Sequence, residues 1–125
     1  HDDASAEAWE ALGCAHLRKH DYDEAERTLE RARRHAPDNA SILRNLAVLL
    51  SRTGRGEESF ALLQRGHELD PRDYLTTFAL ASAYRALDRS AEALELFGEL
   101  LRFRGLPETI RREAESRYVE LSVGW

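Results

Sequence analysis

The 125-residue chain has no methionine, a single cysteine, and only one lysine among its 18 basic residues. Since Cys14 is the only cysteine, it cannot form a disulfide within the chain. No apolar run approaches the roughly 20 residues that a membrane-spanning helix needs, and no signal peptide is visible. We therefore expect no direct insertion into a membrane, and a cytoplasmic location is favoured.

The missing methionine extends to position 1, which predicts that the sequence is a domain of a longer protein or a processed product. The preference for arginine over lysine is the bias expected of a GC-rich bacterial genome. The formal net charge of -5, with 33% of residues charged, argues against a general nucleic-acid binder. Such a protein would need a strongly basic face.

Groups of residues that could support catalysis are also missing. His16 and His20 stand four residues apart, a spacing compatible with metal binding, but no third ligand is in register. Cys14 has no histidine and base in register to activate it. The glycines occur singly, so no phosphate-binding loop is present. The sequence therefore predicts no enzyme, no metal site and no cofactor.

What the sequence does contain is a period of 34 residues. Bulky, small and proline positions recur together in three units, at residues 6–39, 40–73 and 74–107. Bulky residues three or four apart lie on one face of a helix, and small residues let two helix backbones approach closely. Proline has no amide donor for a helix interior, so it separates one pair of helices from the next. In the first unit the recurring residues are Trp9, Leu12, Gly13, His16, Tyr22, Ala25, Leu29, Ala32 and Pro37.

This pattern resembles the tetratricopeptide repeat family, which has a Trp-x-x-Leu-Gly-x-x-Tyr helix, an Ala-x-x-x-Phe helix and a closing proline. The resemblance implies an all-α fold, a right-handed α-solenoid of helix-turn-helix hairpins with seven helices. We expect one domain over residues 1–125, with a capping helix at 108–122 that covers the last apolar face. An ordinary helical bundle with a chance period is the alternative, but three kinds of position recur together.

In the resembled family, the first helices of successive repeats line a concave groove that binds a protein or peptide partner. Five arginines against three glutamates (Glu7, Glu10 and Glu113) give the corresponding positions here a balance of +2, in a chain of net charge -5. A segment with acidic residues and an apolar anchor would suit arginine forks beside apolar side chains. The expected groove residues are Glu10, Cys14, Arg18, Arg44, Asn45, Val48, Arg52, Phe78, Ser82, Arg85 and Arg112.

One subfamily grips the acidic C-termini of heat-shock chaperones with a carboxylate clamp of five residues. The positions of that clamp are occupied here by Glu10, Cys14, Asn45, Leu75 and Ala79, and only Asn45 matches. The sequence therefore argues against a chaperone clamp. Two other classes of function stay open: a secretion-type chaperone for a partner protein, and an assembly scaffold whose convex faces pair to form homo-oligomers.

Overall fold

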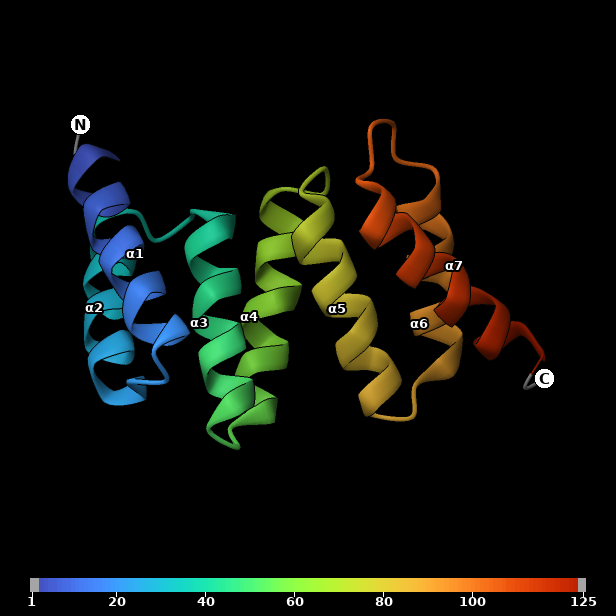
Figure 1. The fold of residues 1–125 in the computed structure, drawn as a ribbon, viewed down its shortest axis with the longest axis horizontal. Helices are drawn as coiled ribbons and strands as arrows, with labels where there is room; N and C mark the ends of the chain where they lie inside the picture. The colour runs from blue at the N-terminus through green and yellow to red at the C-terminus, as the bar shows by residue number, and fades with distance from the viewer. Residues whose placement is uncertain (1–2, 124–125) are drawn as a thin grey trace. The chain divides into compact units, whose positions relative to one another are not determined.

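The computed structural model of the protein describes residues 3–123, and within them the chain forms seven helices and no strand (Figure 1). The predicted all-α fold class and number of helices are confirmed. The helices are α1 (Asp3–Arg18), α2 (Tyr22–His35), α3 (Ala40–Arg52), α4 (Gly56–Leu69), α5 (Tyr74–Ala86), α6 (Ser90–Leu101) and α7 (Glu108–Val123).

The chain divides into two compact units, His1–Asp70 (unit 1) and Pro71–Trp125 (unit 2). Unit 1 holds the hairpins α1–α2 and α3–α4, and α2 also packs against α3. Unit 2 holds the hairpin α5–α6, with α7 packed on α6. A single domain over residues 1–125 stays a prediction.

The starts of α3 and α5 are fixed by equivalent residues 34 apart. The side chain of Asn39 accepts a hydrogen bond from the backbone N–H of Ile42 at 3.1 Å. The carboxylate of Asp73 accepts one from the N–H of Leu75, also at 3.1 Å. These bonds satisfy donors that the first turn of a helix leaves without a partner. The helices that precede them end two residues before Pro37 and Pro71.

The core of unit 1 forms where the small positions let helices approach. Gly13 of α1 is buried so close to α2 that a Cβ built on it would lie 2.6 Å from Cγ of Leu29. Between α3 and α4, the buried hydroxyl of Ser59 donates a hydrogen bond to the carbonyl of Ala47 at 2.7 Å. Close contact thus defines both hairpins of unit 1, and their apolar side chains join in one cluster that includes Leu29 and Leu46.

Leu12 differs from the expected pattern. We predicted it on the buried stripe of the first helix, yet it is 46% exposed, whereas Leu46, at the same position of the second unit, is 1% exposed. The reason is that α2 covers this side of α3, and no described helix covers the corresponding side of α1. Burial at this position therefore depends on a neighbouring helix as well as on the repeat pattern.

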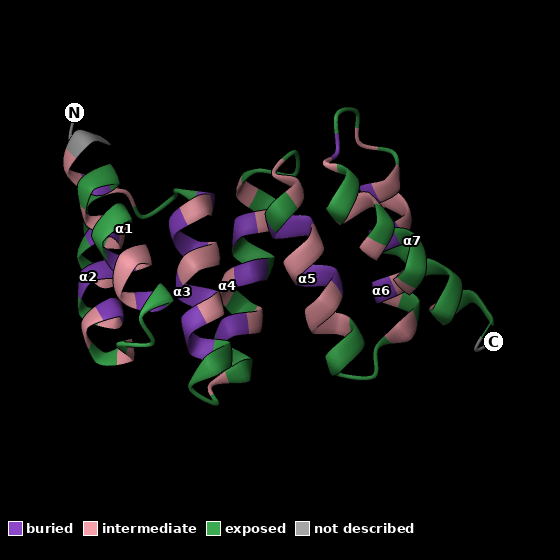
Figure 2. Ribbon diagram, viewed as in Figure 1, coloured by how far each residue is buried: buried purple, intermediate pink, exposed green. Residues whose placement is uncertain are grey.

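Unit 2 keeps the fold with residues that depart from the pattern. Thr77, at the position of the tryptophan, and Leu100, at a small position, are both fully buried. Arg111, at the fourth tryptophan position, donates hydrogen bonds from its guanidinium to the carbonyls of Leu101 and Phe103, each at 3.4 Å. Arg111 thus joins α7 to the end of α6, while Figure 2 shows most of α7 exposed.

Candidate functional site

In unit 1, the expected groove residues of α1 and α3 lie near one another through direct contacts. The Asn45 amide donates a hydrogen bond to the carboxylate of Glu10 at 2.8 Å, and the Ser41 hydroxyl donates to the same oxygen. The guanidinium of Arg44 donates to the Ser41 hydroxyl at 3.5 Å. We call this region the α1–α3 surface; its residues are Glu10, Cys14, Arg18, Arg44, Asn45, Val48 and Arg52.

The pKa of the Cys14 thiol depends on the charged side chains of this surface. Partial burial raises the pKa of the Cys14 thiol, and the nearby charge of Glu10 raises it further. Arg18 and Arg44 lower the same pKa because a positive charge favours the thiolate. The three charged side chains, from both helices, therefore lie within electrostatic reach of one sulfur atom.

The α1–α3 surface also has an apolar floor and exposed positive ends. Val48 is half-buried and packs against the core cluster of unit 1. Arg18 and Arg52, in the last turns of α1 and α3, are exposed. Neither forms an ion pair with another side chain in residues 3–123. Two guanidinium groups are thus available to a carboxylate from outside the chain.

In unit 2, the expected residues are Phe78, Ser82 and Arg85 on α5 and Arg112 on α7. The ring of Phe78 meets the buried ring of Phe97 edge-on, with centroids 6.1 Å apart. Phe78 is half-buried, and Ser82 is half-buried as well. We call these four residues the α5–α7 surface.

Both arginines of the α5–α7 surface have carboxylate partners within unit 2. The Nε of Arg85 lies 3.1 Å from Glu120 of α7, and the Nε of Arg112 lies 3.1 Å from Glu108. Neither glutamate was counted in the charge of the groove predicted from the sequence. Glu120 could have been found from the repeat, because Ala86 follows Arg85 at the end of α5 and a step of 34 from Ala86 ends on Glu120. Among the expected groove arginines, the two without an ion pair within residues 3–123, Arg18 and Arg52, therefore lie on the α1–α3 surface.

Two further observations limit the chemistry of the described residues. They contain no group of three or more His, Cys, Asp and Glu side chains arranged to hold a metal ion. His16 and His20 instead have separate neighbours: His16 lies 3.7 Å from Asp21, and His20 is 2.9 Å from the Tyr22 hydroxyl. Among residues 3–123, no helix is both long and apolar enough to cross a membrane.

Comparison with known proteins places this geometry among repeat structures. The Tetratricopeptide repeat family matches residues 10–74. No curated protein shows significant sequence similarity to the chain.

Solved structures with a similar fold include the TPR2B domain of yeast Sti1 in its complex with pHsp70. It has 22% identity and a TM-score of 0.83, covering 96% of this chain and 98% of that one. The Yersinia enterocolitica type III secretion chaperone SycD, with a peptide of the translocator YopD, has 13% identity and a TM-score of 0.86, covering 97% of this chain and 95% of that one. Pseudomonas aeruginosa pilF has 19% identity and a TM-score of 0.87, covering 98% of this chain and 54% of that one.

Proposed function

Since the chain belongs to the tetratricopeptide repeat family, we propose that it is a protein-interaction module that binds an extended segment of a partner protein. The α1–α3 surface is the main contact. The segment carries acidic residues and one apolar side chain, the chemistry that best complements arginines around Val48.

The observation that carries this proposal is the arrangement of Arg18, Arg44 and Arg52 on two helices of unit 1. Their planar guanidinium groups suit carboxylates because each can donate two parallel hydrogen bonds. Glu10, whose carboxylate accepts hydrogen bonds from Asn45 and Ser41, offsets only one of these three positive charges. The apolar contact comes from Val48, between Arg44 and Arg52 on α3, and from the neutral Cys14 thiol on α1.

This partner differs from the chaperone tails that a carboxylate clamp would hold. The Sti1 domain is in a complex with pHsp70, but its identity to this chain is only 22%. Of the clamp positions in this chain, only Asn45 carries the required residue, and its amide already donates to Glu10. A glutamate beside that amide disfavours a second carboxylate there. The acidic residues of the partner therefore bind toward Arg18 and Arg52.

The α5–α7 surface is a second proposed contact, with more apolar character. Phe78 offers the face of a half-buried ring, and Ser82 offers a hydroxyl one turn further along α5. Arg85 and Arg112 are held by Glu120 and Glu108, so a carboxylate would have to compete with those pairs. An uncharged or aromatic part of the partner suits this surface best.

The proposal is tested by fluorescence anisotropy with labelled peptides that carry an Asp-Glu pair and a leucine. Matched peptides carry Asn-Gln in place of the acidic pair. We expect Arg44→Glu and Arg52→Glu each to weaken binding about tenfold or more, because a hydrogen bond to a charged group contributes ~1.5–3 kcal/mol. Arg104→Glu, with the same change of charge at an exposed residue of unit 2, is the control.

Equal binding by Arg44→Glu, Arg52→Glu and the control would remove the α1–α3 surface from the proposal. Equal binding of the acidic and amide peptides would remove the acidic preference.

A secretion-type chaperone is the second candidate, favoured by the likeness to SycD, which was solved with a translocator peptide. This role predicts a substrate protein that is encoded beside the chain and is poorly soluble alone. Coexpression should then bring the substrate into the soluble fraction, and the Arg44→Glu variant should do so less well. A neighbouring gene product that is equally soluble without the chain would count against this role.

A further inference from the structure

Equivalent residues of α1 and α3 form rows across the α1–α3 surface. On α1 they follow one another at steps of three, four and four residues and so share one helix face: Glu7, Glu10, Cys14 and Arg18. Steps of 34 lead from them to the matching residues of α3, which are Ser41, Arg44, Val48 and Arg52. Glu10 accepts hydrogen bonds from Ser41 and Asn45, which lie on either side of its own row, so the two helices are in register.

The acidic end of this surface is at the starts of α1 and α3. Glu7 is exposed and forms no ion pair with any side chain that the structure describes. Glu10 is half-buried and accepts hydrogen bonds from the neutral groups of Asn45 and Ser41. Arg44 lies in the same row as Glu10, and its guanidinium donates to the Ser41 hydroxyl at 3.5 Å. Two carboxylates against one guanidinium leave this end with a balance of -1.

The other end of the surface is basic, and the middle is uncharged. Arg18 and Arg52, in the last turns of α1 and α3, are exposed and give this end a balance of +2. Between the two ends lies the row of Cys14 and Val48, both half-buried. Since a helix rises about 1.5 Å per residue, Glu7 and Arg18 are separated by about 16 Å along α1. A ligand that complements the whole surface therefore needs opposite charges about that far apart, with an apolar group between them.

We propose that the partner segment carries a basic residue as well as its acidic residues, in the order base, apolar residue, acid. This inference rests on the proposed function, because it adds a basic residue to the acidic segment proposed for the same surface. The base lies beside Glu7 and Glu10. The apolar side chain lies on Val48, and the acids bind Arg18 and Arg52. Because an extended chain advances about 3.3 Å per residue, the base is about five residues from the acid, and the apolar side chain is about two residues from it.

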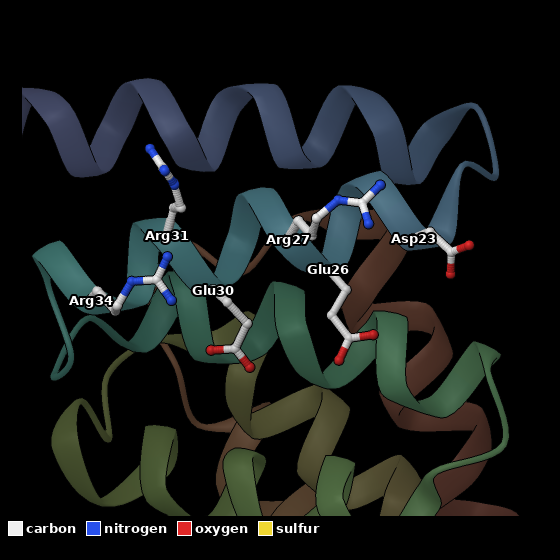
Figure 3. Close-up of a pocket in the computed structure, with 6 residues that line it drawn as sticks. All are labelled: Asp23, Glu26, Arg27, Glu30, Arg31 and Arg34. Atoms are coloured by element: carbon white, nitrogen blue, oxygen red, sulfur yellow. The ribbon is translucent and has the colours of Figure 1, made fainter.

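The charges on the outer side of α2 do not offer the same separation. The side chains drawn in Figure 3 line an open hollow of about 540 Å³ on this helix. Four of them, in the middle of the hollow, alternate in sign and have partners within unit 1: Glu26, Arg27 and Glu30 form ion pairs, and the guanidinium of Arg31 lies 4.9 Å from the centre of the Trp9 ring. A segment with separated charges therefore suits the α1–α3 surface better than α2.

The test compares three labelled peptides by fluorescence anisotropy at low salt, with blocked termini so that the ends add no charge. The ordered peptide is Lys-Ser-Ser-Leu-Ser-Asp-Glu. The moved peptide, Ser-Ser-Leu-Ser-Asp-Glu-Lys, has the same composition and net charge, but its base lies beyond the acids. The amide peptide, Lys-Ser-Ser-Leu-Ser-Asn-Gln, lacks the acids. We expect the ordered peptide to bind about two- to fivefold more tightly than the moved one, the effect of one exposed ion pair. Added salt should reduce this difference.

Variants of the protein then identify the group that recognises the base. Glu7→Gln should bring the ordered peptide to the affinity of the moved one. Glu57→Gln, the same substitution at an exposed residue of α4, is the control and should keep the difference. Glu7→Lys should bind a peptide with glutamate in place of the lysine more tightly than the unchanged protein does, because the exchange restores opposite charges. Circular dichroism checks that each variant is folded.

The proposal is overturned if the unchanged protein binds the ordered and moved peptides equally, or if their difference survives Glu7→Gln. Failure of the proposed function has a different signature. If the amide peptide binds as tightly as the ordered one, the surface has no acidic preference, and the proposed function and this inference fall together. If the ordered peptide exceeds the amide peptide while the position of the lysine has no effect, the proposed function stands and only the order of charges is wrong.

Discussion

At the scale of single residues, the three hairpin turns require the same backbone conformation from three different residue types. His20, Gly54 and Asp88 follow one another at steps of 34, and their φ angles are 62°, 81° and 60°. Glycine adopts positive φ without strain, whereas residues with a Cβ do so at a cost. Only the middle turn therefore has the residue best suited to its backbone.

Replacing Asp88 by glycine should raise the free energy of unfolding by up to about 1 kcal/mol, because the strain of the left-handed conformation is removed. The reverse change, Gly54→Ala, should lower it by about 1 kcal/mol. Both are measured by urea denaturation. A Cβ at Gly54 would meet no atom within 4 Å, so its cost comes from the backbone alone. Loss of stability in Asp88→Gly would show that the aspartate side chain contributes something specific to the turn.

Gly13 has a different role, since it is required for space. A Cβ at this position would lie 2.6 Å from Cγ and Cδ2 of Leu29, which is fully buried and cannot move aside freely. Gly13→Ala should therefore lower the free energy of unfolding by about 1–3 kcal/mol, the usual cost of overpacking a core. Gly56→Ala is the matched control: its Cβ would meet nothing within 4 Å, and alanine favours the helix. Thermal or urea unfolding that ranks the two variants equally would contradict the close approach of α1 and α2.

At the scale of helices, the juxtaposition of α1 and α3 can be tested through the Cys14 thiol. Burial, and then Glu10, raise the pKa of Cys14, while Arg18 and Arg44 lower it. Glu10→Gln should therefore lower this pKa and speed alkylation by iodoacetamide near neutral pH, because the thiolate is the reactive form. Arg44→Gln, a change on the other helix, should raise the pKa and slow the reaction.

The control for this experiment is alkylation in denaturant, where all three proteins should react alike because the neighbours of Cys14 have dispersed. Glutamine at position 10 keeps an oxygen that can accept the hydrogen bond from Asn45, so the surface should keep its shape. A rate that does not respond to Arg44→Gln in the folded protein would mean that α3 lies further from Cys14 than the structure indicates.

The helices themselves were predictable because their determinants are local and periodic. Small residues such as Gly13 and Ala47 and the prolines at 37 and 71 locate the close contacts and the breaks between hairpins. The pairing of charges was not predictable to the same extent. Arg85 and Glu120 are 35 residues apart and meet only because α7 folds back toward α5. An amphipathic pattern gives the exposed side of a helix, but long charged side chains can reach several partners on that side.

At the scale of the whole molecule, the local charge of a surface differs from the net charge of the chain. The chain is negative overall at -5, yet Arg18, Arg44 and Arg52 gather on the α1–α3 surface of unit 1. On α2 the charges are balanced, with acids in the first turn and bases in the last. The α1–α3 surface should therefore attract an acidic segment, whereas α2 presents both signs of charge.

The repeat pattern assigns Leu12 and Leu46 the same position, but a repeat buries this residue only when another helix packs beside it. Leu46 is covered by α2 and is 1% exposed, while Leu12 is 46% exposed. Leu46→Ala should lower the free energy of unfolding by about 2–5 kcal/mol, the usual cost of a buried leucine truncation. Leu12→Ala should cost only about 0.5 kcal/mol. Urea denaturation of the two variants makes a matched comparison, because residue type, substitution and repeat position are the same. An equal loss in both would show that Leu12 is covered in solution, by a second copy or by another segment.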